Sequence, residues 1–551
     1  MLLWQLYIQL KEGENNKMDQ MTLFGKSKKE FINIKEAAIW ASQYLNRNIT
    51  TSNISYLIQY GRIKKYSNNG TSLIKIDDLR TYYDSYDKEK QWKNKLGKDL
   101  NWHLSFNEYK ESERTKHVHR LHPYKGKFIP QLVEYFLDSH IDEFKKQIYF
   151  NKGDIVLDPF CGSGTTLVQS CELGIHAIGI DISAFNSLIS NAKIEKNNIP
   201  EIKEAAYNIT VNLENFQNTT NNVSFEKHLL LELAKFNNKY FPSPEYKRKL
   251  IKGEINEEEY SKDKEDKFLK IFYNLVEKYK IQVNQNKDTS FLDKWFSFPV
   301  RKEIDFIFKV LKIVENEEIY KILAIILSRT IRSCRATTHI DLGTLKEPVL
   351  TTYYCRKHGK ICKPIFSIMG WWQRYSLDTL NRLKEFDELR TDSFQICLTG
   401  DSKSLDIYEE TKKKNPKLAK LLKRQKIKGI FSSPPYVGLI DYHEQHAYSY
   451  EIFGFDRKDE LEIGPLSKGQ GKEARNAYVQ GISDSLNNCK KYLEKDYHVF
   501  LVANDKFNLY PEIANLANMK IVNQFKRPVL NRVEKDRSNA YSEIIFHFKE
   551  K

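Results

Sequence analysis

The chain has 551 residues, 40% of them apolar and 13% aromatic, which is enough to bury several hydrophobic cores in about two to four domains. It contains no apolar run of about eighteen residues and begins without the pattern of a signal peptide, so we expect a cytoplasmic protein with no membrane partner. Seven thinly spread cysteines argue against a disulfide framework, and a formal charge of +16 favours nucleic acid as a partner, although lysine-rich codon usage would give the same bias.

The first part of the chain is predicted to be a small separate unit. Residues 1–30 are an N-terminal extension, and residues 31–85 contain an amphipathic helix, a polar break, a second helix and the β-like segment SLIKI before a last helix. This order resembles the helix-turn-helix of excisionase and MerR-type regulators. The resemblance implies DNA binding through a helix from Ser52 to Tyr60 that ends at Gly61. The charged residues 84–98 are expected to form a connector.

The remainder of the chain is predicted to be an interrupted α/β sheet. Residues 152–183 alternate a strand, a glycine-rich turn, a helix and a second strand, which is typical of a βαβ unit. Strand patterns return only near residues 395, 427, 497 and 541, because long Lys- and Glu-rich helices come between. We therefore expect a catalytic domain made of residues 100–200 and 394–551, with a helical insertion at residues 201–393 as the target-recognition region.

The segment DPFCGSGTT follows the first strand of that sheet. Gly162 and Gly164 would let a ligand approach bare amides at a helix N-terminus, and Asp181 ends the next strand, where its carboxylate can accept ribose hydroxyl groups. These residues indicate a nicotinamide dinucleotide, S-adenosylmethionine or a nucleotide. The dinucleotide is disfavoured because Thr165 and the residues after it supply no third glycine.

A stiff loop with the sequence SSPPY follows a predicted strand that ends near Phe431. Proline fixes its own φ and donates no hydrogen bond, so this strand stops abruptly and turns outward. Taken together, DPFCGSGTT, GIDIS and SSPPY resemble motifs I, II and IV of the amino-group DNA methyltransferases. The resemblance covers residues 117–200 and 394–548. The motifs in combination are far more specific than any one of them alone.

The resemblance implies a fold, a cofactor and a set of site residues. The fold would be α/β, a Rossmann-like class I methyltransferase sheet with a mostly helical insertion and a small N-terminal helix-turn-helix. The cofactor would be S-adenosylmethionine. HPYKGKFIP resembles motif X and TGDSKSL resembles motif III, so the cofactor-binding residues would be Phe128, Asp158, Phe160, Gly162, Gly164, Thr165, Asp181 and Asp401.

The same resemblance assigns the chemistry to Ser433, Pro434, Pro435 and Tyr436, with no metal. The Ser433 side chain and the Pro434 carbonyl would accept the two N–H bonds of an exocyclic amine, the prolines would keep these acceptors rigid, and Tyr436 would stack on a base flipped out of double-stranded DNA. Residues 441–455, which follow this loop, are expected partly to wall the base pocket and partly to be core.

Serine at position 433 points to N4 of cytosine, because N6-adenine members more often carry Asp or Asn there; N6-adenine stays open as an alternative. Cytosine C5 chemistry is disfavoured because it needs a Pro-Cys nucleophile and no cysteine here follows a proline. A methyltransferase of this kind would protect DNA from a partner restriction endonuclease. Two further alternatives are an RNA methyltransferase and a DNA-binding regulator with an inactive methyltransferase body.

A Cys/His cluster lies in the predicted insertion. Cys355, His358 and Cys362, with Cys334 as a fourth ligand, could hold a structural zinc ion, although we favour reduced cysteines and a surface histidine in a turn. Residues 335–348 lie between Cys334 and the others and lack periodicity, which suits a loop for base contacts or a lid over the cofactor.

Overall fold

A computed structural model describes residues 30–45, 48–59, 63–68, 71–287, 289–339, 347–530 and 540–551. The chain divides into two compact units, residues 1–99 and residues 100–551. Tyr60 and Gly61 of the predicted DNA-reading helix, and nearly all of the N-terminal extension, lie outside the described residues. Within the described ranges, no helix combines the length and the hydropathy that a membrane span requires.

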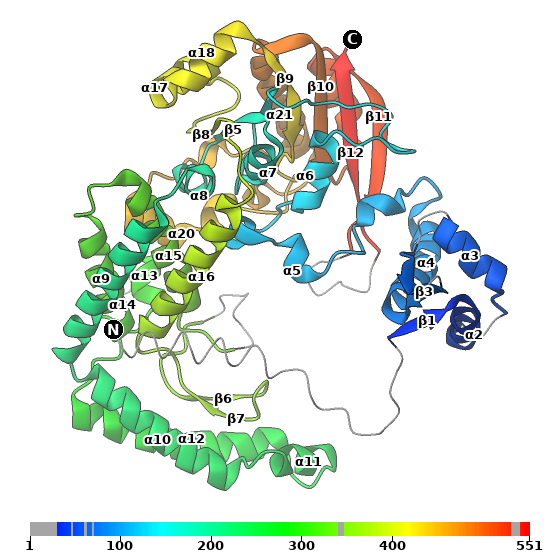
Figure 1. Ribbon diagram of the computed structural model, residues 1–551. Coiled ribbons are helices and arrows are strands. Elements are labelled where there is room, and N and C mark those ends of the chain that lie inside the picture. Colours follow the sequence, from blue (N-terminus) through cyan, green and yellow to red (C-terminus); the bar gives the residue numbers. More distant parts are fainter. Residues whose placement is uncertain are drawn as a thin grey trace. The chain divides into compact units, whose positions relative to one another are not determined.

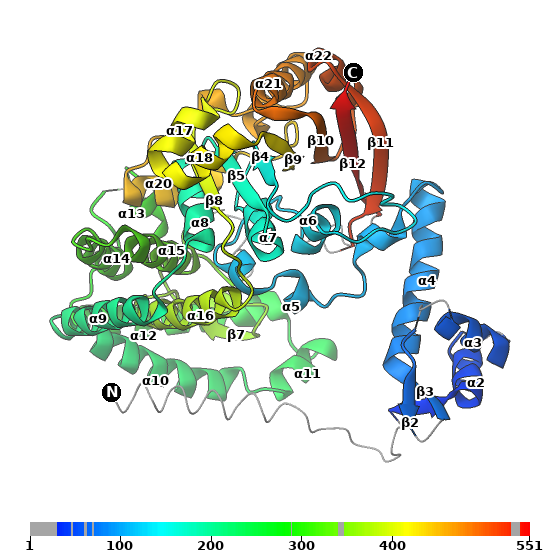
Figure 2. The same ribbon diagram turned by 45° about the horizontal axis from the view of Figure 1, so that its top comes forward.

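The N-terminal unit has helices and a small sheet (Figure 2). Its elements are β1 Phe31–Asn33, α2 Ile34–Leu45, α3 Thr51–Gln59, β2 Tyr66–Asn68, β3 Thr71–Lys75 and α4 Ile76–Leu96, with the strands in the order β1-β3-β2. Ala37, Ala41, Ile54 and Leu79 are buried together between these elements, while most of α3 is exposed. The charged residues 84–98 are not a loose connector, because α4 continues through them as far as Leu96.

The second unit is built on a seven-stranded sheet (Figure 1). The strands are β4 Ile155–Asp158, β5 His176–Asp181, β8 Gln395–Thr399, β9 Ile427–Ser432, β10 Leu493–Ala503, β11 Met519–Pro528 and β12 Ser542–Glu550, in the order β11-β12-β10-β9-β4-β5-β8. Neighbouring strands from β8 to β10 are parallel, whereas β12 is antiparallel to both β10 and β11. The predicted α/β fold class is confirmed. The strand β11 was not predicted from the sequence.

Helices cover both faces of this sheet. Successive strand residues point to opposite faces, so Val156 belongs to one hydrophobic core and its neighbours Ile155 and Leu157 to the other. The first core includes α6 Pro130–Leu137, α7 Thr165–Leu173 and α8 Ala184–Ile194. The second includes α17 Ile407–Lys414, α18 Pro416–Arg424, α21 Lys472–Lys490 and α22 Tyr510–Leu516. Burial on both faces explains why the parallel strands are almost continuously apolar.

Between β5 and β8 the chain is mainly helical after α8. The elements are α9 Ile199–Asn218, α10 Asn222–Tyr240, α11 Glu245–Ile251, α12 Glu257–Tyr279, α13 Phe291–Trp295, α14 Phe298–Leu311, α15 Glu317–Ser333, the hairpin β6 Tyr353–Cys355 and β7 Lys360–Cys362, and α16 Met369–Asp387. Asn198, Asn256 and Asn316 each accept a backbone N–H of the helix that they precede, so the Asn-rich joints begin these helices as N-caps.

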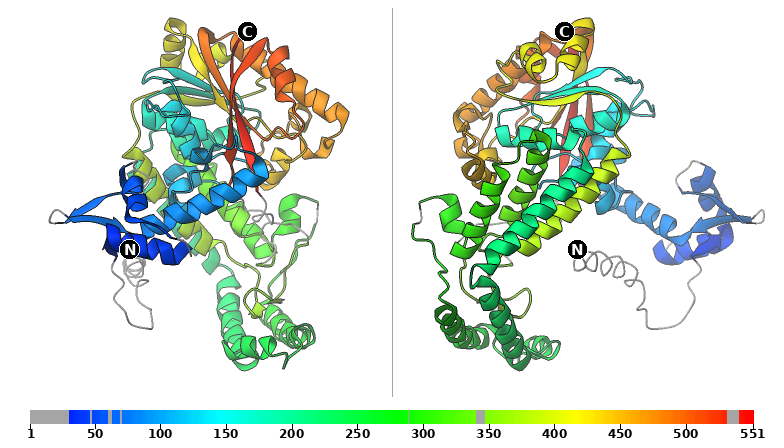
Figure 3. Two further views of the ribbon diagram at one scale, coloured as in Figure 1. Left: turned by 90° about the vertical axis from the view of Figure 1, so that its right-hand side faces the viewer. Right: turned by 60° about the vertical axis from the view of Figure 1, so that its left-hand side comes forward.

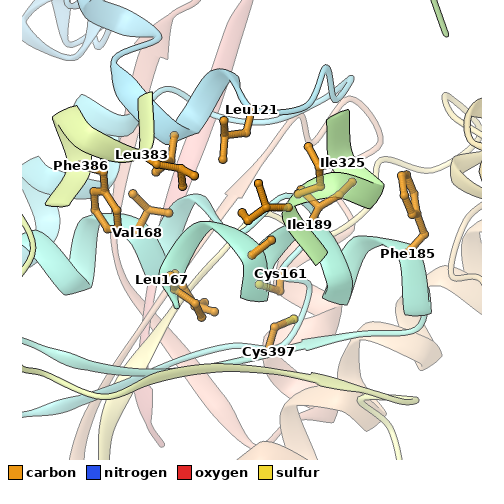
Figure 4. Close-up of a cluster of buried hydrophobic side chains, with 14 of the residues drawn as sticks. Leu121, Cys161, Leu167, Val168, Phe185, Ile189, Ile325, Leu383, Phe386 and Cys397 are labelled. Carbon is orange, nitrogen blue, oxygen red and sulfur yellow. The ribbon is translucent and has the colours of Figure 1, made fainter. Parts of the chain in front are cut away.

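Two parts of this region pack differently. Figure 4 shows Ile325 of α15 and Leu383 of α16 against Val168 of α7 and Ile189 of α8, so these helices share the core that lies on the sheet. Helices α10 to α12 instead form their own core with the β6–β7 hairpin, seen in green in both views of Figure 3. The insertion is therefore anchored at α15 and α16 and extends outward through α10 to α12.

Candidate cofactor and catalytic site

An open pocket with an empty volume of about 870 Å³ lies at the carboxyl ends of β4, β5, β8 and β9. The strand order reverses at β4, and such switch points are where open α/β sheets bind their ligands. The predicted site residues in its wall are Phe128, Phe160, Gly162, Thr165, Asp181, Asp401, Ser433 and Pro435. Asp158, Gly164, Pro434 and Tyr436 are not part of this wall.

The glycine-rich turn between β4 and α7 needs both of its glycines, for different reasons. Gly162 has a φ of +52°, and a Cβ atom there would lie 3.0 Å from the hydroxyl oxygen of Tyr124. Gly164 has a φ of +77° and caps α7, and a Cβ atom there would lie 2.9 Å from Oγ of Ser190 on α8. Gly162 therefore keeps the wall of the pocket open, whereas Gly164 allows α7 and α8 to pack closely.

Asp181 ends β5 and is fixed by the same turn. One carboxylate oxygen accepts the N–H of Gly162 at 2.8 Å, and the other accepts the N–H of Ser183 at 2.9 Å and the amide of Asn186 at 3.1 Å. Burial raises the pKa of this carboxyl to about 6. A carboxylate has about four acceptor positions, so Asp181 keeps capacity for a hydroxyl group of a ligand in the pocket.

Helix α8 supports the turn with two polar side chains that were not predicted from the sequence. The hydroxyl of Ser190 donates to the carbonyl of Gly162 at 3.1 Å, and the ammonium group of Lys193 donates to the carbonyl of Ser163 at 2.5 Å. Lys193 is fully buried, and burial lowers its pKa well below the usual value for lysine. A buried lysine that donates to a turn carbonyl fixes the path of the backbone along the pocket.

Asp158 links β4 to β9, the neighbouring strands at the switch point. It is buried at the end of β4, and its carboxylate accepts the hydroxyl of Ser432 on β9 at 2.5 Å. Thr166 adds a second link, since its hydroxyl donates to the carbonyl of Phe431 at 3.3 Å. Burial raises the pKa of Asp158 to about 6. Asp158 therefore acts on the pocket by holding β4 against β9.

The SSPPY loop leaves β9 at the pocket. The hydroxyl of Ser433 donates to the carbonyl of Val502 on β10 at 3.2 Å, so its proton is engaged and its oxygen can still accept. The hydroxyl of Tyr436 donates to the carboxylate of Glu543 at 2.9 Å, and Glu543 lies 3.5 Å from the guanidinium group of Arg527. Burial, with the nearby Glu543, raises the pKa of Tyr436 well above its usual value.

Other residues complete the pocket. Tyr124 and Lys127 belong to the HPYKGKFIP loop, as does Phe128, whose ring packs edge-on against that of Phe431 at 5.6 Å. Burial lowers the pKa of Lys127 to about 8, and its ammonium group donates to the carbonyl of His119. These neighbours of Phe128 could have been found from the sequence, because they belong to the same HPYKGKFIP motif.

Residues 441–455 lie partly in the wall of this pocket and partly in the core; their predicted role as a wall of the base pocket stays a prediction. Tyr442 and His443 line the pocket, while Tyr448 and Tyr450 are buried behind it. The N–H of His443 donates at 3.1 Å to Glu462, another wall residue, whose pKa burial raises to about 7. Nothing in the sequence singles out Glu462, because it follows a charged segment with no motif.

The predicted zinc ligands are only partly brought together. Cys355, His358 and Cys362 gather with His339, not with Cys334, and one ligand atom from each of the four lies within 4.8 Å of the others. Cys334 ends α15, and its side chain is buried in the core that covers the sheet. The prediction of Cys334 as the fourth ligand is wrong, because its side chain lies in that core while His339 lies beside the hairpin.

The strand order, the glycine-rich turn and the acidic residue at the end of β5 define the class of the protein, an α/β methyltransferase fold with a pocket at the switch point. A family profile described as "DNA methylase" matches residues 7–191. The Type II methyltransferase M.MjaII of Methanocaldococcus jannaschii is 47% identical over 531 residues, which are 95% of this chain and 97% of that protein. The chain belongs to the Type II DNA methyltransferases, which methylate specific DNA sequences with S-adenosylmethionine.

More distant relatives share shorter segments. The Type II methyltransferase M.MvaI of Kocuria varians is 30% identical over 109 residues, which are 19% of this chain and 22% of that protein. The Type II methyltransferase M.BsoBI of Geobacillus stearothermophilus is 35% identical over 97 residues, which are 17% of this chain and 18% of that protein. Among solved structures, an rRNA methyltransferase of Streptomyces viridochromogenes matches over 81% of this chain and 96% of that structure's chain. The two are 8% identical in sequence, and the TM-score of 0.28 is too low to support an argument.

Proposed function

We propose that this enzyme methylates the exocyclic N4 amine of cytosine, on a base flipped out of duplex DNA. The observation that carries this proposal is the position of Ser433, which lines the same pocket as Gly162 and Asp181 and directs its proton away, to Val502. N6 of adenine is the alternative target. Membership of the DNA methyltransferase family argues against the RNA methyltransferase and the inactive regulator.

In the proposed mechanism Ser433 prepares the amine for attack. The lone pair of an aromatic amine is conjugated into its ring, so acceptors for its two N–H bonds favour the pyramidal geometry of a nucleophile. The Ser433 hydroxyl oxygen would accept one N–H and the Pro434 carbonyl the other, and the two prolines keep both acceptors from relaxing. Bound S-adenosylmethionine would supply the methyl group to this nitrogen, and the amine proton would pass to solvent or Ser433.

Tyr436 is proposed to stack on the flipped base. Its hydroxyl is tied to Glu543, and the interaction of Glu543 with Arg527 holds that carboxylate in place. A ring fixed at its far end offers a flat surface with little loss of side-chain freedom on binding. Base flipping itself costs a few kcal/mol, so a stacking partner that is already in position favours the extruded state.

The cofactor-binding role is proposed for the residues around the pocket. Gly162 exposes backbone beside the ligand, and Asp181 would accept ribose hydroxyl groups. Phe128, Phe160, Thr165 and Asp401 lie in the same wall. Asp158 and Gly164 do not line the pocket. Their contacts support structural roles: Asp158 holds β4 against β9, and Gly164 allows α7 and α8 to pack closely.

The other parts of the chain are proposed to select DNA. In the N-terminal unit, Ser52, Asn53, Ser55 and Tyr56 are exposed along α3, as expected of a helix that reads a groove. We infer that residues 201–393 contribute to target recognition and that a restriction endonuclease is the functional partner.

Nucleoside mass spectrometry of DNA treated with the purified enzyme tests the proposed product. N4-methylcytosine is expected, and with Ser433→Ala it should form about 10²-fold more slowly while cofactor binding persists. Detection of N6-methyladenine would overturn the cytosine assignment and retain the amine mechanism. Detection of neither base in several duplex DNAs, with methylation of RNA instead, would overturn both.

A further inference from the structure

The β6–β7 hairpin gathers side chains that bind metals, away from the cofactor pocket. Cys355 ends β6, Cys362 ends β7, and His358 lies in the turn between them. His339, which follows α15, approaches the hairpin, so that one ligand atom from each of the four residues lies within 4.8 Å of the others. We propose that these four side chains bind one structural zinc ion.

The hairpin turn has the shape that such a site requires. The carbonyl of Cys355 accepts the N–H of His358 at 3.0 Å and that of Gly359 at 2.7 Å, and Gly359 has a φ of +61°, which glycine adopts readily. The turn brings Nδ1 of His358 to 3.4 Å from Sγ of Cys362. Tetrahedral zinc with ordinary bond lengths places a nitrogen and a sulfur ligand about 3.6 Å apart, so this pair already has nearly the required spacing.

A neighbouring tyrosine orients the fourth ligand. The hydroxyl oxygen of Tyr353 lies 2.8 Å from Nδ1 of His339 and accepts the backbone N–H of His339 at 3.1 Å. When Nδ1 carries the proton and donates it to this oxygen, Nε2 keeps its lone pair and can bind a metal. Metal-binding histidines commonly have a partner of this kind on the other ring nitrogen.

The ligand set identifies the metal and its role. Two thiolates and two imidazoles suit tetrahedral zinc, and four protein ligands leave no open position for a substrate or a water molecule. None of the four residues lines the cofactor pocket. Reduced cysteines buried for packing alone would not require two histidine rings beside their sulfur atoms, and the ring centroids of His339 and His358 are 4.5 Å apart.

The zinc ion would connect two parts of the insertion that pack into separate hydrophobic cores. Ala336 and Val349 are joined by a backbone hydrogen bond of 2.7 Å, so the chain leaves and returns at one point of the core near α15. His339 lies just beyond this point, whereas the hairpin packs through Ile361 into the core of α10 to α12. Zinc would therefore fix the chain at His339, near the end of α15, to the outer part of the insertion.

Metal analysis of the full-length protein, purified without chelators, tests the site. We expect one zinc per chain, and after exchange with Co²⁺ we expect the visible absorption of tetrahedral cobalt together with a thiolate charge-transfer band. His339→Ala and Cys355→Ser should lose the zinc during dialysis. Cys334→Ala, which changes the wrongly predicted ligand, and His228→Ala on α10 should each retain it.

Wild-type protein that takes up neither zinc nor cobalt would overturn the proposal. So would loss of zinc from Cys334→Ala with retention in His339→Ala, because that result would restore the other ligand set. Far-UV circular dichroism identifies variants that fail to fold. The cobalt spectrum of the wild type decides the question without any variant.

Discussion

Replacement of Asp181 with alanine tests the cofactor site most directly. The carboxylate is held by N–H groups from Gly162, Ser183 and Asn186, so it is fixed in position before a ligand arrives. A hydrogen bond from a ribose hydroxyl to a charged acceptor contributes about 1.5 to 3 kcal/mol, which corresponds to about one to two decades in the dissociation constant. Isothermal titration calorimetry with S-adenosylmethionine should show a weakening of this size in Asp181→Ala.

The pH dependence of cofactor binding is a second test of the role of Asp181. Because burial raises the pKa of Asp181 to about 6, the carboxylate form predominates above that pH and is lost as the pH falls through it. Cofactor affinity should therefore decline below about pH 6 in the wild type, and this part of the decline should be absent from Asp181→Ala. Asp406→Ala, which removes the N-cap of α17 and does not touch the pocket, is the control. Unchanged affinity in Asp181→Ala would refute the assignment.

Three other predictions concern chemistry and DNA binding. Ser433→Ala should lower the rate of methyl transfer by about 10²-fold in single-turnover assays and leave cofactor affinity unchanged; an equal loss in both would indicate a folding defect. Glu543→Gln keeps an acceptor for Tyr436 and should cost less activity than Glu543→Leu, which leaves that hydroxyl without its partner; equal activities would show that the tether is irrelevant. Deletion of residues 1–99 should preserve cofactor binding, lower the affinity for DNA and reduce the slope of that affinity against salt concentration. An unchanged slope would show that the N-terminal unit does not bind DNA.

The parts of the site predicted from the sequence are those with a local signal. Gly162, Asp181 and Ser433 lie at or near the carboxyl ends of strands, and the position of a strand end determines where these residues lie in the fold. The supporting residues carry no such signal: Lys193 lies in an amphipathic helix, and Glu543 is the second residue of the last strand, more than one hundred residues from Tyr436. Their roles depend on which strands become neighbours, and that is a property of the whole sheet.

The same limit explains the incorrect zinc ligand. Spacing along the chain made Cys334 a possible ligand of a site that we did not favour, but its side chain lies in the core beside α15, and His339 is the residue that reaches the hairpin. The overall fold was easier to predict, because parallel strands buried on both faces are apolar along their whole length. The strand β11 was missed because many of its residues are polar and exposed.

The insertion between β5 and β8 has a consequence for how the enzyme is made. Asp158 and Ser432, which join the strands beside the pocket, are 274 residues apart, so a ribosome must synthesise the entire helical insertion before β4 acquires β9 as its neighbour. Until then the nascent β4–β5 pair has an unpaired edge, which favours aggregation or capture by chaperones. Contacts between such distant residues also slow folding. Growth temperature and translation rate should therefore control the yield of active enzyme more strongly than single substitutions on its surface.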